Sequence, residues 1–525
     1  MKRILKTVLM PFMLILAIGG CKKNFQELTI NNNKPNAVPA SLLFNGILND
    51  MTDLPGGNDE IWDQYYIYNY DYYGNNRYDF TGGKTYYTTL VNVHNMENQA
   101  KLSGSPLVNP YTAMGKFFRA YFFSQMSLEM GDIPMTNALK GSANLTPSYD
   151  TQKTVMLQSL AWLEAANTDL TTLVSAGTAT IDGDIYFSGD LLKWQKVVNA
   201  YHIRLLVELS KKATDPDLNI PASFAAILSS PVKYPLMTGN ANNMQYTFLS
   251  PTNYYPDNID NFGQNGSRKN SSATYIGLLT QFSDPRVFVT AEPSRYLVDT
   301  LHLSPTNFAS FVGADPGTDL GTMYNNAGLQ KYSFLNRKRY YSTYLGEPGI
   351  QIGFAELEFN IAEGINHGWA TGSAEAYYKS GILASMASYG IPVSGTFTAY
   401  FYKPGAAGVS VASNYDTYAI NFDFPTWYSN ASIQYATGSF GLTQILQQKY
   451  LAMFRHSGLE SYYSQRRTGV PVFTTGPGTG NGSRIALRFQ YPTSEITANA
   501  VNYKAALQSQ FGGNDDINGL MWILK

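Results

Sequence analysis

Residues 62–87 form the most aromatic stretch of the chain, and amide and charged side chains are interspersed among the rings. Tyr66, Tyr68, Tyr70 and Tyr72 occupy alternate positions, which is the period of an extended segment rather than of a helix. A tyrosine ring offers a flat apolar face that can stack on the apolar side of a pyranose, while amides and guanidinium groups bond sugar hydroxyls. The stretch is therefore a candidate sugar-binding segment.

Two other polar stretches, residues 238–272 and 396–435, also carry aromatic side chains. Long loops of this kind in compact proteins are often functional. The alternative is that the rings pack on a helical scaffold, as most aromatic side chains do in any fold. The candidate ligand-binding residues of the three stretches are Trp62, Tyr70, Tyr72, Tyr73, Asn75, Arg77, Tyr254, Tyr255, Trp427 and Tyr428.

Motifs for catalysis or metal binding are scarce. The chain has 5 histidines and contains neither H-E-x-x-H nor G-x-S-x-G. Glu363 and His367 are spaced as two metal ligands on one helix, but two are too few. They also belong to a polar stripe with Glu356 and Asn360, which fits a buried contact between helices equally well. We predict no enzyme, no metal and no cofactor. A glycoside hydrolase would need two carboxylates facing each other across a bond.

The composition argues against a nucleic-acid partner. Charged residues make up 14% of the chain, aromatic residues another 14%, and the formal net charge is -1. Phosphate neutralisation by Lys and Arg supplies most of the affinity for nucleic acid, and the chain has no long basic run. The surface is expected to be neutral and polar, with tyrosines among its residues.

Residues 1–20 have the pattern of a signal peptide. Lys2 and Arg3 precede a short apolar run, which is too short to span a membrane, and Cys21 follows it as the only cysteine. This arrangement resembles a bacterial lipoprotein signal, so we expect lipid on Cys21 to hold the protein on a membrane. The alternative is an ordinary secretory signal with an incidental cysteine. Residues 21–40, rich in Asn, then form a tether.

The segments that must position these residues are predicted to be paired helices. Residues 111–130 are apolar around most of a helix, which ends at Gly131 and Pro134. Asp150 is expected to cap the next helix, and further helices are predicted over 190–211, 347–389 and 441–454. Helical hairpins with surplus apolar surface must stack on one another, as in solenoid repeats. The predicted fold class is mainly α, with large irregular loop insertions.

A series of short motifs along the chain resembles the SusD/RagB family of outer-membrane lipoproteins from Bacteroidetes, in its SusD-like branch. These motifs are Cys21 with Phe25-Gln26-Glu27-Leu28 and Asn36; Gly131-Asp132-Ile133-Pro134; Pro147-Ser148-Tyr149-Asp150; Gly189-Asp190, Lys193-Trp194 and Asn199; Asp284-Pro285-Arg286; Glu347-Pro348, Ala355-Glu356 and Ala362-Glu363-Gly364; Gln448-Lys449; Arg466-Arg467-Thr468-Gly469; and Arg488, Tyr491-Pro492, Glu495 and Asn499. Their order along the chain makes the resemblance specific.

The resemblance implies a single SusD-like domain over residues 41–525, built from tetratricopeptide-like helical pairs. It also implies a cell-surface, non-enzymatic protein that binds oligosaccharides or polysaccharide fragments and delivers them to a TonB-dependent transporter. Two alternatives remain open on the same scaffold: capture of peptides or another nutrient, and a structural lid of the transporter. Lys22-Lys23-Asn24 departs from the acidic run associated with surface export. The matched motifs are structural, so the candidate aromatics rest on physical argument alone.

Overall fold

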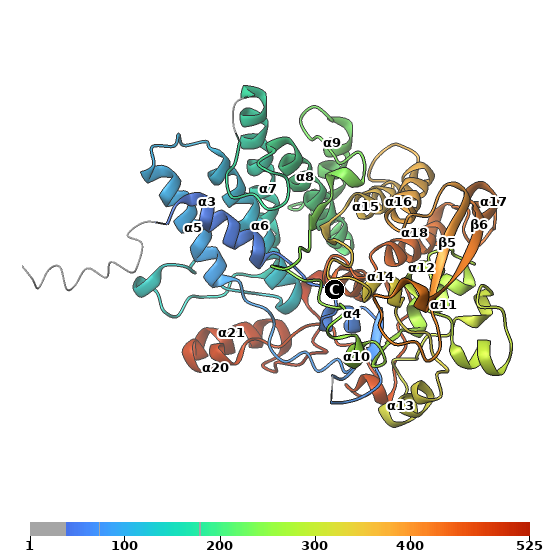
Figure 1. The fold of residues 1–525 in the computed structure, drawn as a ribbon. Coiled ribbons are helices and arrows are strands. Elements are labelled where there is room, and N and C mark those ends of the chain that lie inside the picture. The colour runs from blue at the N-terminus through green and yellow to red at the C-terminus, as the bar shows by residue number, and fades with distance from the viewer. Residues whose placement is uncertain (1–37, 73, 178–179) are drawn as a thin grey trace, which may run out of the picture.

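The computed structural model describes residues 38–72, 74–177 and 180–525, which are mainly α-helical, as predicted. Cys21 and Tyr73 lie outside the described residues. Helices from the first part of the chain gather in one half of the molecule, and short helices, loops and a β-hairpin form the other (Figure 1). The principal helices of the first half, here called the helical frame, are α3 (Ala40–Asp50), α5 (Tyr87–Leu102), α6 (Pro110–Met130), α7 (Gln152–Ala176) and α8 (Leu191–Glu208).

Helix α6 is the central element of the frame, and it packs against both α5 and α7. It begins with a capping box, in which the Asn109 side chain accepts the Thr112 N–H and the Thr112 hydroxyl accepts the Asn109 N–H. Gly131 ends the helix with φ 98°, a conformation that favours glycine. Phe117 and Phe118 are fully buried. The predicted helix, apolar around its circumference, is confirmed.

The start of α7 corrects one prediction. Thr151, not Asp150, caps this helix, because its side chain accepts the Thr154 N–H. The Asp150 carboxylate instead accepts the N–H groups of Met135 and Thr136, at 2.9 and 2.8 Å. Asp150 therefore fixes the loop between α6 and α7. The helix predicted over 190–211 is confirmed as α8, which Asp190 caps by accepting the N–H of Leu192 at 3.0 Å.

Helices from later in the chain join the frame to the other half. These are α15 (Phe354–Asn366), α16 (Ala374–Ser388), α18 (Gly438–Ala452) and α19 (Glu460–Thr468). Helix α15 packs against α8 on one side and against α16 and α18 on the other. Its polar stripe bridges helices: Glu356 accepts from Arg204 Nε at 2.6 Å, and Glu363 from Arg467 Nη1 at 2.5 Å. The stripe is thus a buried helix contact, as the alternative to a metal site predicted.

The loop-built half contains short elements around a second hydrophobic core. Its short helices are α4 (Asn58–Trp62), α10 (Phe262–Asn265), α11 (Ala273–Gln281), α12 (Val287–Thr290), α13 (Leu320–Gly328), α14 (Arg337–Tyr340) and α17 (Phe424–Tyr428). Its antiparallel strand pairs are β1 (Tyr66–Tyr68) with β3 (Lys269–Ser271), and β5 (Ser394–Tyr402) with β6 (Tyr415–Asp423). A third antiparallel pair is formed by β2 (Met244–Tyr246) and β4 (Gly349–Ile352). The β5–β6 hairpin occupies much of the stretch expected to be an irregular insertion.

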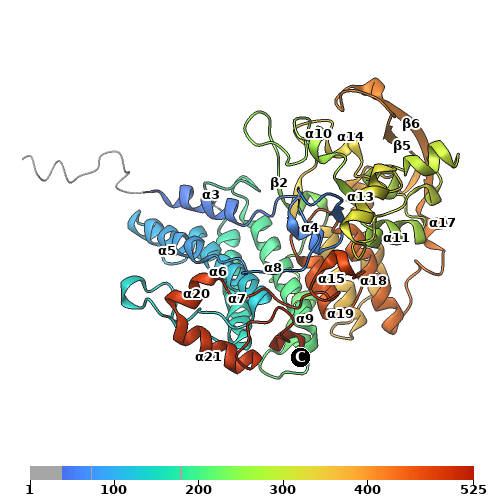
Figure 2. The ribbon, with the colours of Figure 1, turned by 90° about the horizontal axis from the view of Figure 1, so that it is seen from below.

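The remaining helices are α9 (Ile220–Ser229), α20 (Thr493–Ala498) and α21 (Ala500–Phe511). Helices α20 and α21 lie beside α6 and α7 in both views (Figures 1 and 2). In the part of the chain that the structure describes, every helix is too short or too polar to cross a lipid bilayer.

Candidate functional site

The site begins where β1 pairs with β3. The register sets Tyr68 opposite Lys269, so the chain leaving β1 runs beside the residue that precedes β3, Arg268. The Asn69 N–H donates to the Arg268 carbonyl at 3.0 Å, and the Asn69 side chain donates to the Ser267 carbonyl at 3.0 Å. These bonds hold the start of the loop 69–75 against residues 267–268.

Asn76 closes this loop. Its side chain accepts the Tyr68 N–H at 2.9 Å and donates to the Tyr68 carbonyl at 2.8 Å, so one buried amide replaces a strand pairing. Gly74 allows the return, because a Cβ there would lie 2.6 Å from the Tyr68 ring. The loop is thereby fixed at both ends while Tyr70 and Tyr72 extend outward.

Helix α13 brings a third ring to the loop. Asp319 caps the helix by accepting the Thr322 N–H at 2.9 Å. Met323, on its buried face, packs on Ile67 of β1 in a small core that also includes Ala314. Because Tyr324 follows Met323, this packing places its ring beside the loop.

The three rings and one guanidinium form an aromatic cluster, defined here as Tyr70, Tyr72, Tyr324 and Arg268. The ring centroid of Tyr70 lies 6.4 Å from that of Tyr72 and 5.5 Å from that of Tyr324. The guanidinium carbon of Arg268 lies 4.8 Å from the Tyr70 centroid and 5.9 Å from that of Tyr324, a cation–π arrangement. Tyr72 is 82% exposed, so the cluster faces solvent.

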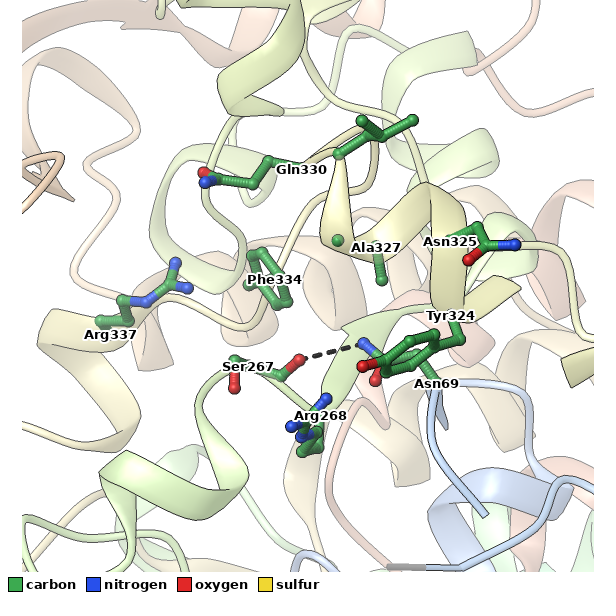
Figure 3. Close-up of a pocket in the computed structure, with 11 residues that line it drawn as sticks. Asn69, Ser267, Arg268, Tyr324, Asn325, Ala327, Gln330, Phe334 and Arg337 are labelled. Atoms are coloured by element: carbon green, nitrogen blue, oxygen red, sulfur yellow. Dashed lines mark hydrogen bonds between the residues drawn. The ribbon is translucent and has the colours of Figure 1, made fainter. Parts of the chain in front are cut away.

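A cavity of about 660 Å³ adjoins the cluster. Its volume is within the range of small-molecule sites. Figure 3 shows its lining: amides, a serine, two arginines and the rings of Tyr324 and Phe334. The lining residues are Asn69, Ser267, Arg268, Tyr324, Asn325, Ala327, Gly328, Leu329, Gln330, Phe334 and Arg337. Ring faces beside amides and guanidinium groups can stack on a sugar and bond its hydroxyls.

Arg337, the first residue of α14, forms the far wall of the cavity. Its guanidinium carbon lies 4.6 Å from the Phe334 centroid, and its Nη2 donates to the Gly266 carbonyl at 3.2 Å. The Arg337 N–H donates to Glu292 at 3.0 Å. Burial raises the pKa of Glu292, and the charge of Arg337 opposes that rise. Arg337 is thus oriented by its own backbone as well as by a ring.

A buried ion-pair network anchors β3 through Lys269. Lys269 Nζ lies 2.8 Å from Asp257 Oδ1, and Arg455 Nη2 lies 2.6 Å from Asp257 Oδ2. Burial would raise the pKa of Asp257, but the two cations outweigh it and lower that pKa to about 2. Because Lys269 follows Arg268, the network anchors the strand that carries the cluster's cation.

Other predicted residues of the first aromatic stretch lie outside the cavity lining. Asn75 and Arg77 are exposed, and Asn75 Oδ1 accepts the Arg77 N–H at 3.0 Å. Arg77 Nε lies 3.3 Å from Asp79. The two residues shape the exit of the loop, and they stay predictions as ligand contacts.

Burial corrects two predicted contacts, Tyr255 and Tyr428, while a third residue, Trp62, is partly buried. The Trp62 ring packs between Phe80 and Phe489, at 4.8 and 5.4 Å between centroids, and its Nε1 donates to the Arg77 carbonyl. Tyr255 is fully buried in the second core, and Tyr428 is 6% exposed, with its hydroxyl bonded to Glu375. The rings of Tyr255 and Tyr428 stabilise the scaffold and cannot offer a face to a ligand at the surface, whereas Trp62 stays a prediction as a ligand contact.

Tyr254 and Trp427 are not brought to the cluster. Tyr254 stacks on Tyr344 at 4.3 Å between centroids. Trp427 is partly buried, and its Nε1 donates to the Phe282 carbonyl at 2.9 Å. Figure 1 shows α17, which contains Trp427, well apart from α13. The predicted rings of the three stretches therefore do not converge on one surface, although residues 267–271 of the second stretch do pair with the first.

Sequence reasoning missed Tyr324, Arg268 and Arg337. Tyr324 lies on a short polar helix with no aromatic neighbour in sequence, and Arg268 lies in a stretch judged only by its length. The one usable signal was the Asn-rich run before Arg268, which favours a fixed loop. Within the described ranges, no three His, Cys, Asp or Glu side chains gather as a metal site.

Solved structures share this architecture. A SusD homologue from Bacteroides fragilis matches with a TM-score of 0.78 and 30% identity, covering 93% of this chain and 100% of that one. An outer-membrane protein from Bacteroides vulgatus, associated with nutrient binding, matches with a TM-score of 0.77 and 28% identity, covering 93% of this chain and 100% of its own. A chitin-binding SusD homologue from Flavobacterium johnsoniae, at 20% identity and a TM-score of 0.68, covers 93% of this chain and 98% of its own, and shows the fold alone.

A comparison with curated proteins finds no match. The family model described as "starch-binding associating with outer membrane" matches residues 32–492, which is most of the chain. Together with the homologue at 30% identity, this match shows that the chain belongs to the SusD-like family of carbohydrate-binding proteins associated with the outer membrane.

Proposed function

We propose that the protein captures oligosaccharides or polysaccharide fragments at the aromatic cluster and delivers them to a TonB-dependent transporter without cleaving them. One observation carries the proposal: Tyr70 and Tyr324 flank Arg268, and Tyr72 lies beside Tyr70, at the edge of a cavity lined by amides. Among the described residues, no carboxylate lines that cavity, whereas glycoside hydrolysis needs two. Membership of a carbohydrate-binding family supports the same assignment.

The expected affinity is modest. An aromatic contact contributes about 0.5–1.5 kcal/mol, and only a few rings form the cluster. The dissociation constant should therefore be micromolar or weaker. Weak binding suits a protein that must release its ligand to a partner.

Two features favour a glycan over the alternatives. Peptide capture would call for a deep cleft lined by backbone groups, whereas side chains of Tyr324, Phe334 and Arg337 line this cavity. A purely structural lid could bury its rings in its own core, and Tyr72, which is 82% exposed, is not buried in this chain.

Calorimetry against a broad panel of neutral and acidic oligosaccharides tests the proposal. Wild type should bind at least one member, and Tyr70→Ala and Tyr324→Ala should each weaken that binding about 3- to 10-fold. Tyr254→Ala is the matched control, because Tyr254 is 39% exposed and its ring stacks on a different tyrosine. The proposal fails if no glycan binds, or if only the control variant weakens binding. A peptide library in the same assay tests the first alternative.

Location and partner require tests in cells. We propose an outer-membrane lipoprotein anchored through Cys21 and facing the exterior, on the basis of the sequence before and at Cys21 and the family description. Cys21→Ser should move the protein from the membrane fraction to the soluble fraction. If the anchored wild type faces the exterior, protease added to intact cells should degrade it. Tagged protein purified from outer membranes should carry a TonB-dependent transporter, and its absence would contradict the delivery step.

A further inference from the structure

The charges around the cavity are one-sided. Its lining contains two arginines, Arg268 and Arg337, and no aspartate or glutamate. The chain as a whole is close to neutral, with a formal net charge of -1. A pocket of one sign, walled by rings of low polarity, focuses the field on a ligand of opposite sign. The imbalance is therefore a local feature of the site.

Both guanidinium groups are held with a face on an aromatic ring. Arg268 stacks on Tyr70, and Arg337 lies 4.6 Å from the Phe334 centroid and 6.0 Å from that of Tyr402. Stacking leaves the N–H edge of a guanidinium directed outward, which is the edge that binds a carboxylate or sulfate with two parallel hydrogen bonds. Figure 3 shows the two arginines flanking Ser267 along one side of the cavity.

The carboxylates nearby are already committed. Among the described residues, no Asp or Glu oxygen lies within 4.0 Å of the Arg337 guanidinium. Glu292 is buried, and its two oxygens accept the N–H groups of Arg337 and Tyr402. Asp257 is enclosed by Lys269 and Arg455. Glu292 and Asp257 therefore do not compete with an anion for Arg337.

The remaining lining fits the neutral part of a sugar. Asn69 is buried at the wall of the cavity, where its Nδ2 donates to the Ser267 carbonyl at 3.0 Å. Amide groups can both donate to and accept from sugar hydroxyls. Asn325 and Gln330 add two further amides along the wall.

We propose that the cavity takes an oligosaccharide that carries an anionic group, either a uronate carboxylate or a sulfate ester. Arg268 and Arg337 attract the anion, the faces of Tyr70 and Tyr324 hold the sugar ring, and the amides of Asn325 and Gln330 bond its hydroxyls. This inference rests on the proposed glycan-binding function and narrows it to acidic glycans.

Matched ligand pairs isolate the charge. Calorimetry would compare oligogalacturonate with its fully methyl-esterified form, and a sulfated galactan oligosaccharide with its desulfated form. We expect the acidic member of at least one pair to bind 10-fold more tightly or better in 50 mM NaCl, with the ratio shrinking in 500 mM NaCl because salt screens charges. The pair that shows the preference distinguishes carboxylate from sulfate.

The variants locate that preference. Arg337→Gln and Arg268→Gln should each reduce the ratio between acidic and neutral members several-fold, whereas Arg337→Lys should retain part of it. Lys338→Gln is the control, because it removes one positive charge from the same helix without touching the cavity lining. Thermal melts establish which variants fold, and two independent arginines keep the test decisive if one does not.

The outcomes separate this inference from the proposed function. Equal binding of acidic and neutral members, or an undiminished preference in both arginine variants, overturns the acidic ligand while glycan capture stands. Binding of neutral glycans alone has the same consequence. If no glycan of any charge binds, the proposed function itself fails.

Discussion

The helical frame and the loop-built half bury their apolar surface by different means. The frame packs Phe117, Phe118 and Trp194 from long capped helices. The second core instead contains tyrosines whose hydroxyls bond backbone, as Tyr65 does to the Tyr450 carbonyl at 2.8 Å. Short segments there are fixed by side chains such as Asn76 and by buried ion pairs. A frame held by helix packing can thus support loops whose shape depends on polar contacts.

The largest expected effect on stability comes from a substitution in the core of the helical frame. Phe118→Ala should lower the free energy of unfolding by about 3–5 kcal/mol, because it opens a cavity among fully packed rings. Tyr72→Ala in the loop-built half should change it by less than about 0.5 kcal/mol, since that side chain is exposed. Urea unfolding of both variants measures the difference. Equal effects would contradict the division into frame and loops.

A substitution beneath the site tests how the loop-built half is held. Asp257→Asn should lower the free energy of unfolding by about 3–5 kcal/mol, because the buried cations Lys269 and Arg455 lose the negative charge that they share. Asp299→Asn removes a half-exposed partner of Arg295, and it should lower the free energy of unfolding by about 1 kcal/mol or less. Calorimetry on the folded Asp257→Asn protein should also show weaker glycan binding. Unchanged stability and binding would show that the network is dispensable.

Helix α19, which joins the two regions, and the ion-pair network of the loop-built half should also differ in their response to pH. The pKa of Glu460 is raised to about 7: burial is the main cause, the charge of Arg204 opposes it, and the charges of Glu208 and Glu356 add to it. The folded state then holds a proton that the unfolded state has released, so this group's stability contribution falls as pH rises from about 4.5 to 7. The slope is at most about 1.4 kcal/mol per pH unit. Because the pKa of Asp257 is lowered to about 2, this carboxylate stays charged and its contribution to the free energy of unfolding is constant over that pH range.

Glu460→Gln isolates this contribution. The difference in unfolding free energy between wild type and variant should change steadily between pH 5 and 7, measured by urea unfolding at each pH. The corresponding difference for Asp257→Asn should stay level over the same range. Parallel stability curves for wild type and Glu460→Gln would refute the assignment.

The smallest expected effect concerns one ring of the cluster. Tyr324→Phe keeps the face and loses the hydroxyl, so it should weaken glycan binding less than Tyr324→Ala, whose loss is about 3- to 10-fold. Neither change should alter stability by more than about 0.5 kcal/mol, because Tyr324 is 44% exposed. Calorimetry and thermal melts check both points. Equal losses in the two variants would assign the contact to the hydroxyl.

The frame was predictable because helix periodicity and caps are local signals. Residues 111–130 show their apolar circumference in the sequence, and Gly131 and Pro134 mark the end. The cap of α7 was misplaced by one residue, since Asp150 and Thr151 are both good caps and only the fold assigns Asp150 to the preceding loop. The β5–β6 hairpin did leave a signal: Phe397, Ala399 and Phe401 alternate with exposed residues.

The site was only half predictable, because long-range pairing decides which rings meet. Tyr70 and Tyr72 could be selected from their stretch, but nothing local links them to Tyr324 or Arg268. Tyr254 and Tyr255 are adjacent in sequence, yet one is 39% exposed and the other fully buried. Composition identifies candidate rings, whereas the β1–β3 register and the packing of α13 select among them.

A crystal structure of the protein with an oligosaccharide that it binds tests the central claim most directly. We predict density for a sugar ring against Tyr70 or Tyr324, with Arg268 bonded to the ligand. Ordered ligand at the Tyr254–Tyr344 pair or beside Trp427, with the cavity next to the aromatic cluster unchanged, would contradict the account.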